Sequence, residues 1–305
     1  MTSQQPVDIH GKPYNRSLLV GVLLIGTFCT ILNQTLLTTA LPTLMKEFDI
    51  SASSVQWLTT GFLLVNGIMI PISAWLINKF SSKKLYITAM STFLIGTIIC
   101  FVAQDFGMLL TGRLVQAAGV GVSMPLLQTI MLSIFPPEKR GAAMGTTGIV
   151  IGLAPALGPT LSGWIIDSYT WRDLFGMVIP IVVLVLILAS FLMKNVIQLS
   201  NPSIDVLSVI LSTLGFGSLL YGFSSVGDKG WGSPQVYGFL IVGAIVLCLF
   251  TYRQLHLEQP FLELRVFKSK VFTVAAILSG VTNMAMIGAE MVLPLYIQNI
   301  RGESR

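Results

Sequence analysis

The chain alternates between long apolar runs and short polar segments along its whole length. A hydrocarbon core about 30 Å thick is crossed by a helix of about 20 apolar residues, and runs of that length recur down the chain. Nine windows are therefore expected to be transmembrane helices: Ser17–Leu41, Val55–Ile77, Leu85–Ala103, Phe106–Phe135, Gly141–Ile166, Leu174–Met193, Val206–Val226, Val236–Tyr252 and Val271–Ile300. The pattern predicts an all-α polytopic membrane protein.

Composition and charge agree with this picture and orient it. Of the 305 residues, 53% are hydrophobic and only 10% are charged, against about 25% in an ordinary soluble domain. The mean hydropathy is +0.81. If the N-terminus is cytoplasmic, twelve of the eighteen Lys and Arg residues fall in inner segments, five fall in outer segments, and Arg113 lies within a span. The positive-inside rule thus predicts a multi-pass membrane protein with a cytoplasmic N-terminus.

Several function classes are disfavoured by the residues that the chain carries. Its three cysteines lie singly inside apolar runs, and its two histidines lie outside the spans, so we expect no metal site and no disulfide framework. No phosphate-binding loop of the form G-x-x-x-x-G-K-[ST] is present, which argues against ATP as the energy source. Because the basic residues are scattered over short loops, the net charge of +5 does not indicate a nucleic-acid partner. We expect no enzyme activity, no catalytic residue and no cofactor.

The fifth window carries small residues on one helical face. They recur at steps of three and four along the helix, at Gly141, Gly145, Gly148, Gly152, Ala156, Pro159 and Gly163. Small residues let helix backbones approach closely in lipid, so this face is expected to be a groove that contacts another helix. Pro155 and Pro159 each remove a backbone donor and are expected to bend the helix.

Two ionisable residues lie within the predicted spans. An arginine at the bilayer centre costs at least about 2.5 kcal/mol on insertion scales, so Arg113 is expected to face a bundle interior or a wet cavity, unless it snorkels to the outer interface. Glu290 has no charged neighbour in its own span. Desolvation favours the protonated form of a carboxyl, which suits proton coupling, although a structural carboxyl in a hydrogen-bond network is an equal alternative.

Further polar side chains in the apolar spans are candidates for a substrate path. Amides and hydroxyls in such spans either line a path or form hydrogen bonds between helices, and the sequence leaves both readings open. Methionine adds an adaptable apolar surface. The candidates are Asn33, Gln34, Thr38, Asn66, Gln116 and Met124.

These segments resemble the fourteen-helix drug:proton antiporters of the major facilitator superfamily, especially the lincomycin-resistance type of exporter. The stretch "GIVIGLAPALGPTLSGWI" is similar to the antiporter motif of that family, "GRLVQAAGVGV" to its fourth-helix motif, and "NQTLLTTALP" to its first-helix signature. The matching motif positions in the fifth helix are Gly148, Gly152, Pro155, Gly158, Pro159 and Gly163. The resemblance implies a role in proton transfer for Arg113.

The chain departs from the family pattern in two places. The first-helix signature usually has an aspartate where this chain has Asn33, so no titrating group is available there. The cytoplasmic stretch "AWLINKFSSKKLY" resembles the gating loop of the superfamily, but Asn78 replaces its aspartate while Lys79, Lys83 and Lys84 remain. The usual charge pairing of that loop is therefore in doubt.

The resemblance implies a domain plan. Residues 1–16 are expected to be a cytoplasmic tail, 17–194 the N-terminal six-helix bundle, 204–253 a two-helix insert, 254–270 a cytoplasmic linker, and 271–305 the first helix of an incomplete C-terminal bundle. About five further helices would complete the family's second half. The implied function is export of amphipathic drugs in exchange for protons by alternating access within the lipid bilayer. The alternative is a truncated, transport-incompetent remnant or a non-transporting membrane scaffold.

Overall fold

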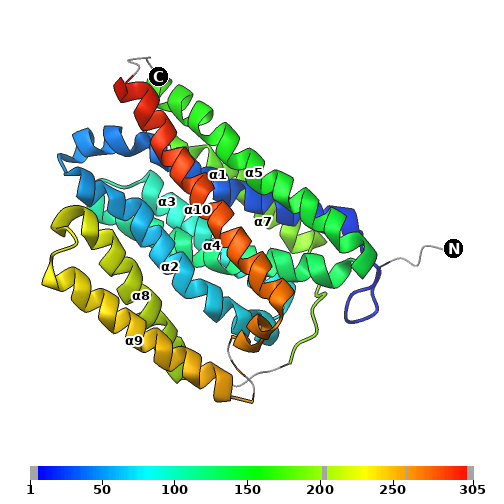
Figure 1. Ribbon diagram of the computed structural model, residues 1–305. Helices are drawn as coiled ribbons and strands as arrows, with labels where there is room; N and C mark the ends of the chain where they lie inside the picture. The colour runs from blue at the N-terminus through cyan, green and yellow to red at the C-terminus, as the bar shows by residue number, and fades with distance from the viewer. Residues whose placement is uncertain (1–5, 201–204, 259, 261, 301–305) are drawn as a thin grey trace. The chain divides into compact units, whose positions relative to one another are not determined.

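The computed structural model describes residues 6–200, 205–258, 260 and 262–300, with the side chains of 228, 287 and 289–300 excepted. Within this part of the chain the secondary structure is helical apart from one isolated bridge between Val7 and Pro13 (Figure 1). The helices are α1 (Arg16–Phe48), α2 (Ala52–Lys79), α3 (Ser82–Phe101), α4 (Phe106–Ile134), α5 (Pro137–Ser168), α6 (Asp173–Gly176), α7 (Val178–Leu192), α8 (Val206–Lys229), α9 (Pro234–His256), the 3₁₀ helix η1 (Leu264–Lys268) and α10 (Lys270–Ile300).

The predicted spans correspond to these helices. Among the described residues, eight helical segments are long and apolar enough to cross a membrane, with α6 and α7 together forming the sixth. The ninth predicted window lies in α10, whose described part includes a shorter apolar helix over Lys270–Met286. The chain is thus an all-α, multi-pass membrane protein, as its hydrophobic pattern predicts.

Local sequence signals set the starts of several helices. Four residues that precede a helix accept a hydrogen bond with their side chains from the amide three residues further on: Asn15, Ser51, Asp105 and Asp205. These caps satisfy amides that have no partner inside the helix. Because the connections at α1–α2, α2–α3 and α3–α4 are only a few residues long, successive helices are held close together.

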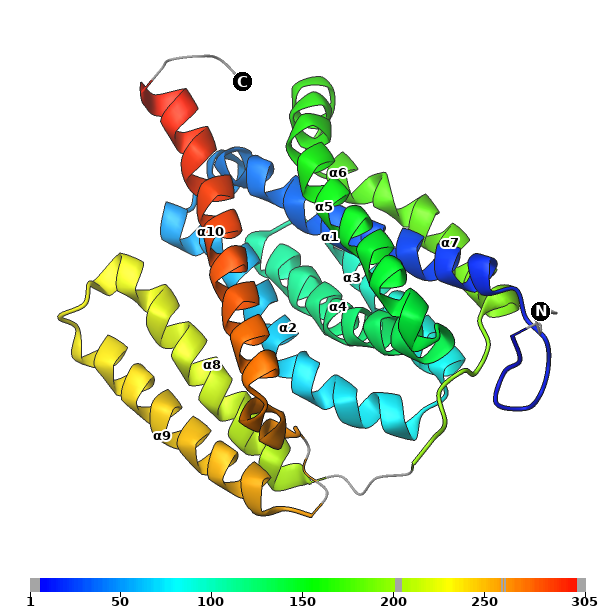
Figure 2. The ribbon, with the colours of Figure 1, turned by 45° about the vertical axis from the view of Figure 1, so that its right-hand side comes forward.

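The chain divides into two compact units, Met1–Phe250 and Thr251–Arg305. In the first unit α4 lies between α2 and α3, and α5 packs along α1 (Figure 2). A large share of α4 is buried, including Arg113 and Gln116. This central position is what places the polar residues of α4 inside the bundle.

Glycines let α3 and α4 approach until their backbones almost touch. A Cβ on Gly112 would lie 2.6 Å from Cys100 Sγ and 2.9 Å from both the Cys100 nitrogen and the Gly96 oxygen. A Cβ on Gly119 would lie 2.5 Å from the Ala89 oxygen. Close approach at small residues is a common way to join helices in lipid, where there is little hydrophobic drive between them.

The helices α8 and α9 form a hairpin (Figure 1). Within it, glycines of each helix receive leucine side chains of the other. A Cβ on Gly215 would lie 2.6 Å from Leu247, and one on Gly243 would lie 2.8 Å from Leu219. The hairpin packs on α2 through α8, where the rings of Trp57 and Tyr221 are 5.7 Å apart.

In the second unit the end of α9 and the connection to α10 are tied by hydrogen bonds. The Arg265 guanidinium donates to the carbonyl oxygens of Leu255 (3.1 Å) and Leu257 (2.8 Å). The Leu262 amide donates to Gln254 Oε1 at 3.0 Å. The predicted linker therefore contains ordered structure, including η1.

Candidate functional site

The arginine of α4 lies inside the bundle. Arg113 is 1% exposed, which excludes the snorkelling alternative. One terminal nitrogen, Nη1, donates to Asn33 Oδ1 on α1 at 2.9 Å and to Gln116 Oε1 on α4 at 2.8 Å. Arg113 thus links two helices through neutral amide oxygens.

The second helix supplies the other contacts of the guanidinium. Arg113 Nε donates to the Leu58 carbonyl oxygen at 3.5 Å, and Cζ lies 4.3 Å from the centre of the Phe62 ring. A guanidinium over an aromatic face gains a favourable electrostatic interaction, which is stronger when water is excluded. Among the described side chains, no carboxylate lies within salt-bridge distance of Arg113. The buried positive charge is held by dipoles and a ring.

The network continues into α3 through the amide of Gln116. Gln116 Nε2 donates to Thr97 Oγ1 at 2.8 Å, and that hydroxyl donates to the Phe93 carbonyl oxygen at 2.7 Å. Thr97 and Gln116 are both 0% exposed. The Gln116 side chain accepts from Arg113 and donates to Thr97, so the orientation of its amide is set. Contacts from α1, from α2 and, through Gln116, from α3 therefore fix the orientation of the guanidinium.

The structure separates the predicted substrate-path residues into two groups. Asn33 and Gln116 are buried in the Arg113 network, where the interhelical hydrogen-bonding reading applies to them. The other four are partly or fully accessible in the described unit: Gln34, Thr38, Asn66 and Met124. The helical repeat predicts which residues share a face of a helix, but it does not predict which face points into the bundle.

Sequence reasoning missed Thr97, Phe62 and the Leu58 carbonyl. Thr97 sits in the apolar stretch "LIGTIICF", directly after Gly96, whose Cβ position lies 2.5 Å from the Gln116 nitrogen. A threonine beside a glycine in an apolar span was the available signal. Nothing in the sequence marks a particular backbone carbonyl or ring as an arginine partner.

The small face predicted on α5 turns away from α1. The α5 residues that pack on α1 include Gly158, whose Cβ position lies 2.3 Å from Thr35 Oγ1, and Ser162, whose hydroxyl donates to the Leu36 oxygen at 2.7 Å. No described atom lies within 4 Å of the Cβ positions of Gly148, Gly152 or Gly163. The predicted close-contact groove is therefore open in this unit, since the motif alternates between two sides of the helix. The helix itself runs on through Pro155 and Pro159.

The loop between α2 and α3 is held by contacts other than the lost charge pairing. Lys79 Nζ lies 4.6 Å from the centre of the Trp75 ring, and Asn78 Nδ2 donates to the Ala74 oxygen at 2.9 Å. Lys83 donates from its ammonium group to the Ser190 carbonyl oxygen at the end of α7. The remaining lysine, Lys84, is exposed. The predicted role of this loop in gating stays a prediction, as does the role of Glu290, whose side chain lies outside the described residues.

A family model decides what kind of protein this is. The model described as Major Facilitator Superfamily matches residues 23–304, nearly the whole chain. The chain belongs to the Major Facilitator Superfamily. Membership confirms the predicted all-α fold and the multi-pass membrane character of the chain. The Major Facilitator Superfamily is a family of transporters and not of enzymes.

The relatives of the chain include proteins named for transport, for drug resistance and for drug export. The uncharacterized MFS-type transporter YcnB of Bacillus subtilis (strain 168) is 56% identical over 294 residues, which is 96% of this chain and 62% of that protein. The lincomycin resistance protein LmrB of Listeria monocytogenes serovar 1/2a is 44% identical, covering 92% and 60%. The multidrug export protein EmrB of Escherichia coli (strain K12) is 30% identical, covering 95% and 58%. The chain thus spans about three-fifths of the length of these relatives.

Solved structures of two transporters share the fold at low sequence identity. A peptide transporter POT in complex with sulfate is 15% identical with a TM-score of 0.59, over 83% of this chain and 54% of that one. The human organic anion transporter MFSD10 is 16% identical with a TM-score of 0.53, over 79% and 73%. At this identity the likeness concerns the helical fold alone.

Proposed function

We propose that the protein is a proton-coupled multidrug exporter of the plasma membrane that works by alternating access. The similarity to a lincomycin resistance protein and to a multidrug export protein supports export of small-molecule drugs. In this proposal residues 17–194 form the first six-helix bundle, 204–253 the insert, 254–270 a cytoplasmic linker and 271–305 the first helix of the second bundle. The asymmetric distribution of Lys and Arg supports a cytoplasmic N-terminus.

The observation that carries the coupling proposal is the buried Arg113 charge. Placing an arginine at the bilayer centre is unfavourable by about 2.5–3.5 kcal/mol on insertion scales, and neutral amides offset this only in part. Arginine keeps its charge at any working pH, so it does not release the proton itself. A fixed positive charge instead stabilises a nearby carboxylate and orders water or polar groups along a proton path.

Glu290 is the group that we propose to take up and release the proton. The chain has Asn33 where its family usually has an aspartate, so the first helix offers no titrating group beside Arg113. Protonation would neutralise Glu290 and allow it to pass through an apolar environment, and deprotonation would return it to a state that favours a positively charged partner or drug. Asn33, Gln116 and Thr97 act as positioning residues that hold the guanidinium.

The test is proton-driven dye transport in everted membrane vesicles, using a cationic fluorescent dye and an imposed pH gradient. The protein is expressed from its complete coding region. Glu290→Gln is nearly isosteric but does not ionise, and we expect it to stop uphill efflux while dye binding is retained. Arg113→Lys keeps the charge but loses the planar donor group, and we expect slower efflux.

Arg140→Lys is the matched control, because Arg140 is exposed and donates only to the Phe135 carbonyl oxygen among the described contacts. This variant is expected to transport at the parental rate. Proton-driven efflux at the parental rate in Glu290→Gln would move the coupling carboxylate elsewhere. A parent protein that shows no pH-driven efflux would remove the exporter proposal itself.

A further inference from the structure

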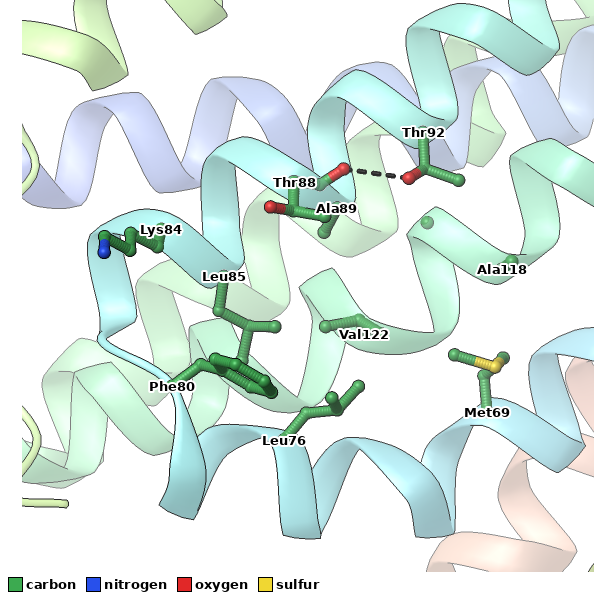
Figure 3. A pocket seen from close by; sticks show the side chains of 11 residues that line it. Met69, Leu76, Phe80, Lys84, Leu85, Thr88, Ala89, Thr92, Ala118 and Val122 are labelled. Carbon is green, nitrogen blue, oxygen red and sulfur yellow. Dashed lines mark hydrogen bonds between the residues drawn. The ribbon is translucent and has the colours of Figure 1, made fainter. Parts of the chain in front are cut away.

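A pocket opens between α2 and α3, with α4 behind it (Figure 3). Its lining includes none of the side chains of the Arg113 network. Its volume is about 270 Å³. Its lining consists of Met69, Leu76 and Phe80 from α2, of Lys84, Leu85, Thr88, Ala89 and Thr92 from α3, and of Ala118, Gly119 and Val122 from α4. The walls are thus apolar except for two hydroxyls and one ammonium group.

The polar groups of the pocket are confined to its α3 side. Lys84 stands near the first turn of α3, at the end of the helix that meets the short α2–α3 loop (Figure 3). Thr92 donates its hydroxyl hydrogen to the Thr88 carbonyl oxygen at 2.9 Å, so it presents oxygen lone pairs and no free donor. The ammonium group of Lys84 is therefore the charged donor available to a ligand in this pocket.

Lys84 differs from the two lysines beside it. Lys79 lies over the Trp75 ring, and Lys83 donates to the Ser190 carbonyl oxygen. For Lys84, no hydrogen-bond or ion-pair partner occurs among the described residues, and its side chain is exposed. The segment from Asn78 to Lys84 carries these three positive charges and no carboxylate. A negative partner for this end of the pocket must come from outside the segment.

We propose that this pocket binds an anionic phospholipid, with one acyl chain against Leu76, Leu85 and Val122 and the phosphate on Lys84. In a membrane-spanning helix, a basic residue next to a short loop lies at headgroup depth, where anionic lipids supply negative charge. The volume is just under the range of about 300–1,000 Å³ that holds a whole drug-sized ligand, which favours a single chain over a complete drug.

Native mass spectrometry of the purified full-length protein tests the proposal. The probes are dioleoylphosphatidylglycerol and dioleoylphosphatidylcholine, which have the same acyl chains and differ in headgroup charge. Lys84→Gln is expected to weaken retention of phosphatidylglycerol about fivefold, the effect of one basic residue near an anionic surface, and to leave phosphatidylcholine unchanged. Lys79→Gln is the matched control from the same loop and is expected to change neither.

A second variant tests the apolar part of the pocket. Ala118→Leu adds bulk from α4 and is expected to weaken retention of both lipids, while glycerol phosphate alone is expected not to displace phosphatidylglycerol. If Ala118→Leu lowers the unfolding temperature, Thr92→Leu is used in its place, because it fills the pocket from α3. Unchanged phosphatidylglycerol retention in Lys84→Gln, an equal loss in Lys79→Gln, or full displacement by glycerol phosphate would each overturn the proposal.

Discussion

The close packing of α3 against α4 can be tested with one added methyl group at Gly112, the residue before Arg113. In Gly112→Ala the added methyl carbon would lie 2.6 Å from Cys100 Sγ and 2.9 Å from two backbone atoms of α3. Carbon atoms pack at about 3.5–4.0 Å, so α3 and α4 must separate by roughly 1 Å. The backbone atoms have no rotamer by which to move aside. Overpacking of this kind destabilises a protein by about 2 kcal/mol.

The same separation acts on the polar network. Gln116 lies one turn beyond Gly112 and donates to Thr97 across the α3–α4 contact at 2.8 Å. Lengthening this bond by roughly 1 Å takes it beyond the hydrogen-bonding range of about 3.2 Å. We therefore expect Gly112→Ala to lower both the stability of the protein and its transport rate.

Thermal unfolding of the purified protein measures the first effect. A loss of about 2 kcal/mol corresponds to a Tm about 4–8 °C lower in a domain of 150–250 residues. Gly148→Ala is the matched control, because no described atom lies within 4 Å of its Cβ position. Alanine is favoured over glycine in a helix, so the control Tm should be equal or slightly higher. A Tm for Gly112→Ala at or above that of Gly148→Ala would refute the close contact.

Other variants probe the network, the orientation and the α5 motif. Asn33→Leu removes the oxygen that accepts from Arg113, and we expect it to cost about 1–2 kcal/mol in thermal unfolding, whereas Asn33→Asp should retain the stability. An unchanged melting curve for Asn33→Leu would contradict this. Cysteines placed at Ser81 or Ser269 should resist a membrane-impermeant thiol reagent applied to intact cells, and modification at either site would reverse the proposed orientation. Gly152→Leu should insert at normal abundance, because its Cβ position is open in this unit, yet abolish dye efflux; normal efflux would leave its face without a mechanical role.

The hydrophobic pattern was sufficient for the fold because each span must satisfy its own backbone hydrogen bonds in lipid. Length and polarity therefore locate the helices with little help from tertiary structure. The burial of Arg113 followed from the same argument, since a charge in a span must find polar partners. The motifs around Arg113 and along α5 identified the family because several glycines and prolines recur at fixed spacing.

The partners of Arg113 were beyond the sequence for a geometric reason. Asn33 and Gln116 are polar residues in apolar spans, which made them candidates for a substrate path. Only the rotation of α1 and α4 about their axes turns them toward the guanidinium. Thr97 comes from α3, where the neighbouring Gly96 was the only mark of its position. On α5, the repeat places small residues on one face of the helix but does not say that α1 packs on a different face.

The neutrality of the groups around Arg113 has an electrical consequence. Within the described part of the bundle, the network carries a net positive charge in the membrane interior, and its amide and hydroxyl partners do not screen that charge with an opposite one. Moving one elementary charge across 100 mV corresponds to about 2.3 kcal/mol. A rocking motion that carries α4 through a tenth of the membrane field would therefore couple voltage to the bundle by about 0.2 kcal/mol per 100 mV. An interior-negative potential would then favour positions of the bundle that bring Arg113 closer to the cytoplasm.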